Sequence, residues 1–238
     1  MKRFYKETAV DLGDGGHRIL LDGKPMRTPA KAVLVVPTRA LAEAIAGEWG
    51  QVPDEADINA SHLPLTRLAA TGLDRVTTQR ARVIEDTAKY AGSDMLCYRA
   101  SEPETLVTRQ QEMWQPLLDW AAQRYGARLI VVEGLAFVEQ PADAMARLHD
   151  VVATHSDLGL SALYNLTHIS GSLVVALAAA EGHLSAADAF AAAQLDELYQ
   201  IERWGSDPIA TKRHEGIRHD IAASARFLAL LEQQRLKG

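Results

Sequence analysis

The hydrophobic pattern of this sequence changes its period between Pro37 and Leu65, and this change constrains the fold more than any other feature. Before Pro37, short apolar segments alternate with turn sequences, as in antiparallel strands. After Leu65, apolar residues recur every three or four positions, as in helices. We therefore predict an α+β fold, with a small β-rich domain at residues 1–63 and a mainly α-helical bundle domain at residues 64–238.

The amino-terminal part should form a small meander. Strands are expected near residues 4–10, 17–21, 24–27 and 32–36. So small a sheet buries little apolar surface by itself. We therefore expect a helix over residues 38–49 to cover one face with Leu41, Ile45 and Trp49, because these three residues share one side of a helix.

The remainder should be mainly helical. One long or kinked helix is expected from Leu65 to near Gly92, and another should open with a capping box at residues 101–104 and be kinked or restarted at Pro116. Further helices are predicted at residues 142–155, 161–180, 185–204 and 208–236, with Gly159, Gly182 and Gly205 as breaks. A short strand is predicted at residues 95–99, and a strand pair at residues 128–132 and 134–138.

The helix predicted at residues 185–204 places polar residues on its apolar side. At about 100° per residue, Glu197 falls roughly 20° from Phe190, and Gln194 falls roughly 40° from it on the other side. A carboxylate on such a face must be paired, hydrogen-bonded or partly wet, because burying it bare is costly. Glu197 therefore either pairs with an internal arginine or contacts a partner, and the sequence leaves both interpretations open.

The ends of this helix carry clear signals. Ser185 is suited to cap its start, with Asp188 in support. Gly205 should end it, and Ser206-Asp207-Pro208 should begin the next helix with a cap, a first-turn carboxylate and a fixed backbone angle.

Charge and composition exclude several classes of protein. The net charge of −6 provides no general attraction to nucleic acid. The single cysteine, Cys97, cannot form an internal disulfide and indicates a reducing compartment. Residues 158–180 are the most apolar stretch, but Asn165 and His168 within it favour a buried helix over a membrane span. The amino terminus lacks a signal-peptide core, so the chain is expected to remain where it is made.

The sequence contains none of the common catalytic or cofactor motifs that we searched for. A phosphate-binding loop, a dinucleotide-binding glycine pattern and a His-Glu-x-x-His zinc pattern are all missing, so no catalytic, cofactor or metal site is expected. We interpret His168 as a satisfied core residue and Cys97 as a small buried hydrophobe. The four tryptophans, at positions 49, 114, 120 and 204, are expected in the core.

Short segments spread in order along nearly the whole chain carry a family resemblance. They are Lys2-Arg3-Phe4-Tyr5, residues 19–31 (Ile-Leu-Leu-Asp-Gly-Lys-Pro-Met-Arg-Thr-Pro-Ala-Lys), residues 41–49, Leu63-Pro64-Leu65-Thr66, residues 90–99, Gly171-Ser172-Leu173 and the stretch that ends at Trp204-Gly205. In this ordered set the chain resembles the assembly chaperones that act on the alpha subunit of the catalytic head of F-type ATP synthase.

The resemblance implies a chaperone without enzymatic activity or cofactor, monomeric when free. Such a protein holds the unassembled alpha subunit until the beta subunit replaces it. It implies a bacterial cytoplasmic protein, with the mitochondrial matrix after processing as the alternative. It also places the helix before Gly205 among the functional surfaces, so the partner-binding residues are predicted to be Glu197, Gln194, Gln200, Trp204 and Asp207. Two other functions stay open, an enzyme with a site around Glu197, His168 or Cys97, and a generic interaction scaffold.

Overall fold

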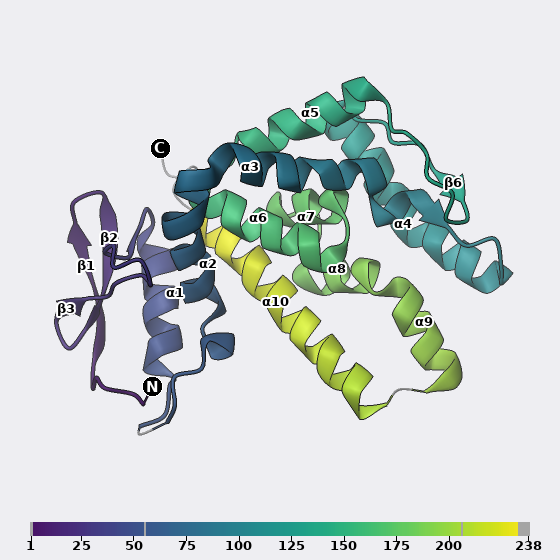
Figure 1. Ribbon diagram of the computed structural model, residues 1–238. Helices are drawn as coiled ribbons and strands as arrows, with labels where there is room; N and C mark the ends of the chain where they lie inside the picture. Colours follow the sequence, from purple (N-terminus) through teal and green to yellow (C-terminus); the bar gives the residue numbers. More distant parts are fainter. Residues whose placement is uncertain (1, 55, 206, 233–238) are drawn as a thin grey trace. The chain divides into compact units, whose positions relative to one another are not determined.

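The computed structural model describes residues 2–54, 56–205 and 207–232. By its internal packing the chain divides into two compact units (Figure 1). Among the described residues, the first unit takes those of 2–80, 156–162 and 226–232, and the second takes those of 81–155 and 163–225. A small sheet at the amino terminus is followed by a mainly helical chain, so the predicted α+β fold is confirmed. The predicted division into two independently folding domains at residue 63 stays a prediction.

In the first unit, β1 (Thr8–Gly13) and β2 (Gly16–Leu21) form an antiparallel hairpin. The short strands β3 (Lys24–Pro25) and β4 (Val35–Val36) both pair antiparallel with β2, and Figure 1 labels β1, β2 and β3. Gly16 is required at its turn, because its φ is 143° and an added Cβ would lie 2.5 Å from the carbonyl oxygen of Val36.

One helix covers this sheet, as the sequence predicts. α1 (Arg39–Gly50) packs on β1 and β2, and the Thr38 side chain caps it by accepting a hydrogen bond from the Leu41 N–H at 3.2 Å. Leu41 and Ile45 are fully buried, and Trp49 is buried at the far end. All three residues are therefore buried on one side of α1, as expected from their spacing.

The kinked helix predicted from Leu65 is present as a series of segments. They are α2 (Pro64–Thr71), a π-helical turn (Gly72–Val76), α3 (Thr77–Ala88) and a 3₁₀ turn (Lys89–Ser93). The Glu48 carboxylate caps α2, accepting from the backbone N–H groups of Leu65 at 2.7 Å and Thr66 at 2.9 Å. Burial raises the pKa of this carboxyl, while the hydrogen bonds oppose that shift.

The second unit is built mainly from helices, some of which run into the first unit. They are α4 (Glu104–Tyr125), α5 (Ala142–Ala153), α6 (Asp157–Ser170), α7 (Leu173–Ala180), α8 (Ala186–Ala193), α9 (Leu195–Trp204) and α10 (Pro208–Glu232) (Figure 1). α7 is buried from Leu173 to Ala179 and packs against α4 and α8, so it forms the centre of this unit. The predicted end of the last helix, at residue 236, lies outside the described residues.

The single helix predicted at residues 161–180 is wrong. The chain breaks at Gly171, whose φ is 70°, and Ser172 caps α7 by accepting from Val175 N–H at 3.0 Å. The fully buried Asp94 supports the break, because its carboxylate accepts from the Val174 N–H at 3.1 Å. Gly159, the expected break, lies inside α6.

The single helix predicted at residues 185–204 is also wrong. Gln194 has φ −115° and ψ 18°, which separates α8 from α9. The angular positions calculated for one continuous helix therefore do not apply across this residue.

The strand pair predicted at residues 128–138 is replaced by a different pairing. β6 (Val132–Glu133) pairs in parallel with β5 (Tyr98–Arg99), and residues 95–97 form a 3₁₀ turn. The Gln140 side chain takes the place of a neighbouring strand for Ile130, with hydrogen bonds of 2.7 and 3.0 Å to its backbone.

The capping box predicted at residues 101–104 is wrong as well. α4 begins at Glu104 with Pro103 as its N-cap residue, which provides no side-chain acceptor. The helix then continues through Pro116 without a restart.

Candidate partner-binding site

The site begins with the way α9 is held against α4. Asp196 accepts a hydrogen bond of 2.7 Å from the Gln110 amide, and the Tyr199 hydroxyl lies 2.6 Å from that of Thr105. On α8, before the break at Gln194, the Ala192 carbonyl accepts a hydrogen bond of 2.9 Å from the Trp114 indole N–H. These contacts join positions far apart in sequence, and they fix which face of α9 turns toward α4.

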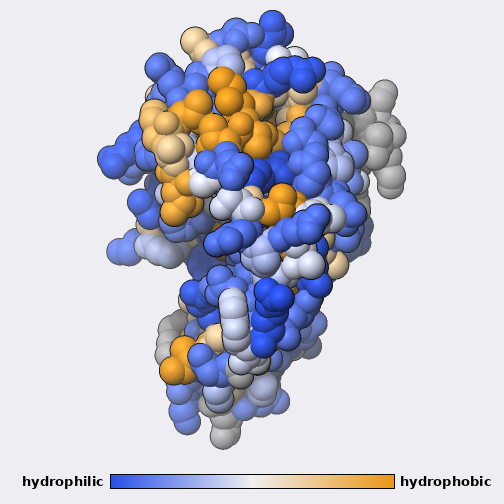
Figure 2. All heavy atoms as spheres, turned by 90° about the vertical axis from the view of Figure 1, so that its right-hand side faces the viewer, coloured by the Kyte–Doolittle hydropathy of each residue, from blue (hydrophilic) through white to orange (hydrophobic). Residues whose placement is uncertain are grey.

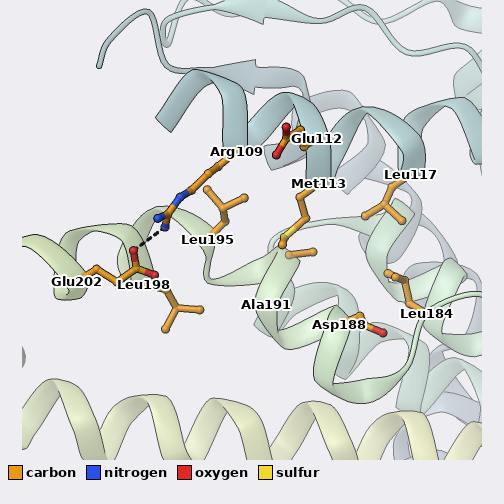
Figure 3. A pocket seen from close by; sticks show the side chains of 11 residues that line it. Arg109, Glu112, Met113, Leu117, Leu184, Asp188, Ala191, Leu195, Leu198 and Glu202 are labelled. Carbon is orange, nitrogen blue, oxygen red and sulfur yellow. Dashed lines mark hydrogen bonds and ion pairs between the residues drawn. The ribbon is translucent and has the colours of Figure 1, made fainter. Parts of the chain in front are cut away.

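An apolar groove lies between α4, α8 and α9 (Figure 3). Its volume is about 420 Å³, and its lining residues are Arg109, Glu112, Met113, Leu117, Leu184, Asp188, Ala191, Ala192, Leu195, Leu198 and Glu202. Arg109 and Glu202 form an ion pair of 2.6 Å across one end, as the dashed line in Figure 3 shows. The groove thus combines an apolar floor with charged residues of both signs at its rim.

The groove was not predicted from the sequence. Leu195, Leu198 and Glu202 lie at i, i+3 and i+7 and so share one face of α9. That stripe could have been recognised in the sequence. Its counterpart on α4, which includes Met113 and Leu117, could not, because the sequence does not show which face of α4 packs against α9. Figure 2, which faces the side where α4 and α9 lie in Figure 1, shows a contiguous apolar area among hydrophilic residues.

Glu197 lies on the opposite face of α9 and has arginine and histidine partners. Its carboxylate accepts a hydrogen bond from the Arg213 guanidinium, and its other oxygen lies 3.0 Å from Nε2 of His214, both on α10. The Arg213 hydrogen bond, more than the His214 one, holds the pKa of Glu197 below its usual value, against a smaller opposing effect of burial. The Glu197 side chain is 42% exposed, so this pair joins two helices at the surface and not in the core.

The other predicted partner-binding residues, apart from Gln194, lie near the end of α9 and the start of α10. Gln200 and Trp204 share the Glu197 face of α9, at i+3 and i+7. Trp204 is 75% exposed, so its predicted place in the core is wrong, and Ile209 just beyond the turn is 83% exposed. Asp207 caps α10 by accepting from the N–H groups of Ile209 and Ala210, each at 2.8 Å.

Gln194 is separate from this cluster, because it occupies the break between α8 and α9. Its amide nitrogen donates to the Ala193 carbonyl at 3.1 Å. Its amide oxygen is buried and has no hydrogen-bond partner within the described ranges, 2–54, 56–205 and 207–232. The structure therefore brings together Glu197, Gln200, Trp204 and Asp207, and places Gln194 at the inner end of α9.

The residues of the alternative enzymatic interpretation have different surroundings. Cys97 is buried, and this burial raises the pKa of its thiol to about 12, so the reactive thiolate is disfavoured. His168 is exposed and not in the core, contrary to prediction, and its Nδ1 lies 2.7 Å from the Tyr90 hydroxyl. In the part of the chain that the structure describes, no three His, Cys, Asp or Glu residues are grouped to hold a metal ion. Nor does any helix there combine the length and apolarity needed to cross a membrane.

The chain is similar in sequence and structure to several known proteins. A family model described as ATP12 chaperone protein matches residues 2–122. The mitochondrial protein atp12 of Schizosaccharomyces pombe is 25% identical over 248 residues, covering 99% of this chain and 85% of that protein. The crystal structure of Atp12 from Paracoccus denitrificans matches with a TM-score of 0.89 and 38% identity, over 97% of this chain and 98% of that one. A crystal structure of a protein from Agrobacterium tumefaciens matches with a TM-score of 0.91 and 41% identity, over 97% and 86%.

Proposed function

Because this chain belongs to the ATP12 chaperone protein family, we propose that it is an assembly chaperone for the catalytic head of F-type ATP synthase. Its client is the unassembled alpha subunit, which it holds until the beta subunit takes its place. An orphan subunit exposes the apolar surface meant for its neighbour and would otherwise aggregate. A chaperone for it must therefore bind that surface specifically and still release it.

The observation that carries this proposal is the apolar surface of the second unit. The groove between α4, α8 and α9 offers a place for apolar side chains of the client, and its charged rim limits which surfaces fit. Trp204 and Ile209 add two large exposed side chains on either side of the turn before α10. Exposed aromatic residues of this kind are the usual energetic anchors of a protein interface.

Within this surface each predicted residue has a distinct role. Trp204 is the apolar anchor, and Asp207 holds the turn by capping α10. Gln200 is exposed and supplies an adaptable hydrogen-bonding group beside Trp204. Glu197 is proposed to exchange part of its pairing with Arg213 for a basic group of the client, which its exposed carboxylate permits. Gln194 acts indirectly, because it lies at the break between α8 and α9 and so helps to position α9 for the client.

In this proposal the protein is not an enzyme and needs no cofactor. It is monomeric when free, and it works in a bacterial cytoplasm, with a mitochondrial matrix protein after processing as the alternative. The buried thiol of Cys97 argues against nucleophilic catalysis at that position. A generic scaffold would also bind proteins, but it would not select one subunit of the synthase.

The test is suppression of aggregation of purified alpha subunit, followed by light scattering. Scattering should fall as the chaperone approaches one equivalent, and beta subunit alone should not be captured when the two are offered separately. Trp204→Ser should lose this protection, while Leu135→Ser, which changes a 93% exposed side chain elsewhere in the second unit, should keep it. Equal capture of alpha and beta, or robust ATP hydrolysis by the pure protein, would contradict the proposal.

A further inference from the structure

The first unit contains a second apolar groove that the proposed function does not use. Buried side chains of Met26, Leu34, Trp49 and Leu63 line it together with the half-buried Ala70. Its volume is about 740 Å³. An open apolar concavity of this size is typical of a binding site.

The walls of this groove are held in place by hydrogen bonds. The Trp49 indole N–H donates to the Thr66 hydroxyl at 3.0 Å. On the other side, the Asp74 carboxylate accepts from the Thr28 hydroxyl at 2.6 Å and from the Ala30 N–H at 2.9 Å. The two bonds to Asp74 hold the loop at residues 28–30 against the π-helical turn at Gly72–Val76. The groove is therefore formed before a ligand binds, so binding loses little conformational entropy of the protein.

The charge at the rim indicates what would bind. Arg27, Arg67 and Arg75 line the groove, and Asp74 is the one acidic residue among the lining residues that the structure describes. The oxygens of Asp74 already accept the two bonds from Thr28 and Ala30. The rim is therefore positive although the whole chain carries a net charge of −6. Arginine pairs with carboxylates through two parallel hydrogen bonds, which adds geometric selectivity to the attraction.

We propose that this groove binds a short protein segment in which apolar side chains are flanked by aspartate or glutamate. The apolar side chains occupy the space above Trp49 and Leu63, and the acidic residues pair with Arg27 and Arg75. This inference is independent of capture of the alpha subunit, because it concerns residues of the first unit only.

The probe is a fluorescein-labelled synthetic peptide with a Leu-Val-Phe core and a pair of glutamates at each end. Its binding to the full chain is measured by fluorescence anisotropy at low salt, beside a matched peptide with lysines in place of glutamates. The acidic peptide should bind at least about tenfold more tightly, and added salt should reduce the difference. The double variant Arg27→Glu, Arg75→Glu should lose about tenfold in affinity for the acidic peptide and should now prefer the basic one.

A matched double variant, Arg39→Glu with Arg82→Glu, changes the same charge at exposed arginines outside the groove. It should leave binding within about twofold, since its charges do not line the groove. Ala70→Trp should block the acidic peptide by filling the groove, and thermal melts of all variants show whether they fold.

Three results would overturn the inference. The first is equal binding of the two peptides, or an unchanged preference in the Arg27→Glu, Arg75→Glu variant. The second is binding of phosphatidylserine vesicles without binding of the acidic peptide, which would make the rim a lipid surface. The third is self-association, removed by the same variant, through the exposed Leu135 and Phe137, which lie between Glu133 and Glu139 in the second unit. That result would assign the groove to a second copy of the chain.

Discussion

Replacing the buried Asp94 by asparagine should remove a pH-dependent loss of stability. The Asp94 side chain is completely buried, and its two oxygens accept from the N–H groups of Leu96 and Val174, each at 3.1 Å. Burial raises the pKa of this carboxyl from 3.8 to about 6, although the hydrogen bonds from Ser172 and from the backbone work in the opposite direction. The energetic cost of burying the charge therefore exceeds what its hydrogen bonds return.

The sign of the effect follows from the direction of the shift. The folded state has the higher pKa, so it binds more protons than the unfolded state between about pH 4 and pH 6. The contribution of Asp94 to stability is present at acid pH and is lost as the pH rises through this window. A shift from 3.8 to about 6 corresponds to about 3 kcal/mol in the free energy of unfolding, at about 1.4 kcal/mol per pH unit.

The assay is urea unfolding of the wild type and Asp94→Asn between pH 4 and pH 8, followed by tryptophan fluorescence. Asparagine does not titrate, so the free energy of unfolding of the variant should rise relative to the wild type by about 2–3 kcal/mol across this range. Asp119→Asn, which changes an exposed carboxylate on α4, should show no comparable trend. If Asp94→Asn is destabilised relative to the wild type more strongly at pH 8 than at pH 4, the reasoning is refuted, because the folded state would then favour the ionised carboxylate.

Three further outcomes are expected. Glu197→Gln should lower the free energy of unfolding by only about 1 kcal/mol or less in thermal melts, because the ion pair is half-exposed. Glu197→Lys should in addition reduce capture of the alpha subunit. If both variants melt and capture the alpha subunit like the wild type, Glu197 neither stabilises the fold nor binds the client. Trp204→Ser should leave the melting temperature unchanged, since the side chain is 75% exposed, yet weaken alpha-subunit capture about tenfold in a pull-down titration. Limited proteolysis followed by mass spectrometry should cut first within residues 51–61, where most of the described residues, Pro53 and Asp54 among them, are exposed and outside regular helices and strands. Rapid cutting inside the helices instead would show that the division near residue 63 is misplaced.

The elements that the sequence predicted well are those specified by neighbouring residues. Ser185 caps α8, accepting from the Asp188 N–H at 3.1 Å, and Gly205 ends α9 with a φ of 81°. The helix predicted at residues 38–49 is present as α1, and the Thr38 side chain caps it. Each signal depends on a side chain and a backbone group within a few positions, so the sequence contains everything needed to recognise it.

The failures involve contacts that are distant in sequence. Ile130 is satisfied by Gln140 where a neighbouring strand was expected, and β6 pairs with a strand more than thirty positions earlier, at Tyr98. The break at Gly171 is stabilised by Asp94, which lies far upstream. A pattern of apolar residues cannot indicate such partners, because it predicts which positions are buried and not which residues they contact.

The break at Gln194 shows why the candidate site in particular escaped prediction. No glycine or proline marks it, and the contacts that settle the direction of α9 come from Gln110 and Thr105 on α4. Once α9 is reoriented, the single apolar arc expected on one helix separates into two faces. Leu195 faces the groove, while Glu197 turns toward α10 and meets Arg213. Glu197, which the sequence placed on an apolar face, instead links two surface helices, and its exposure is what would let it contact the proposed client.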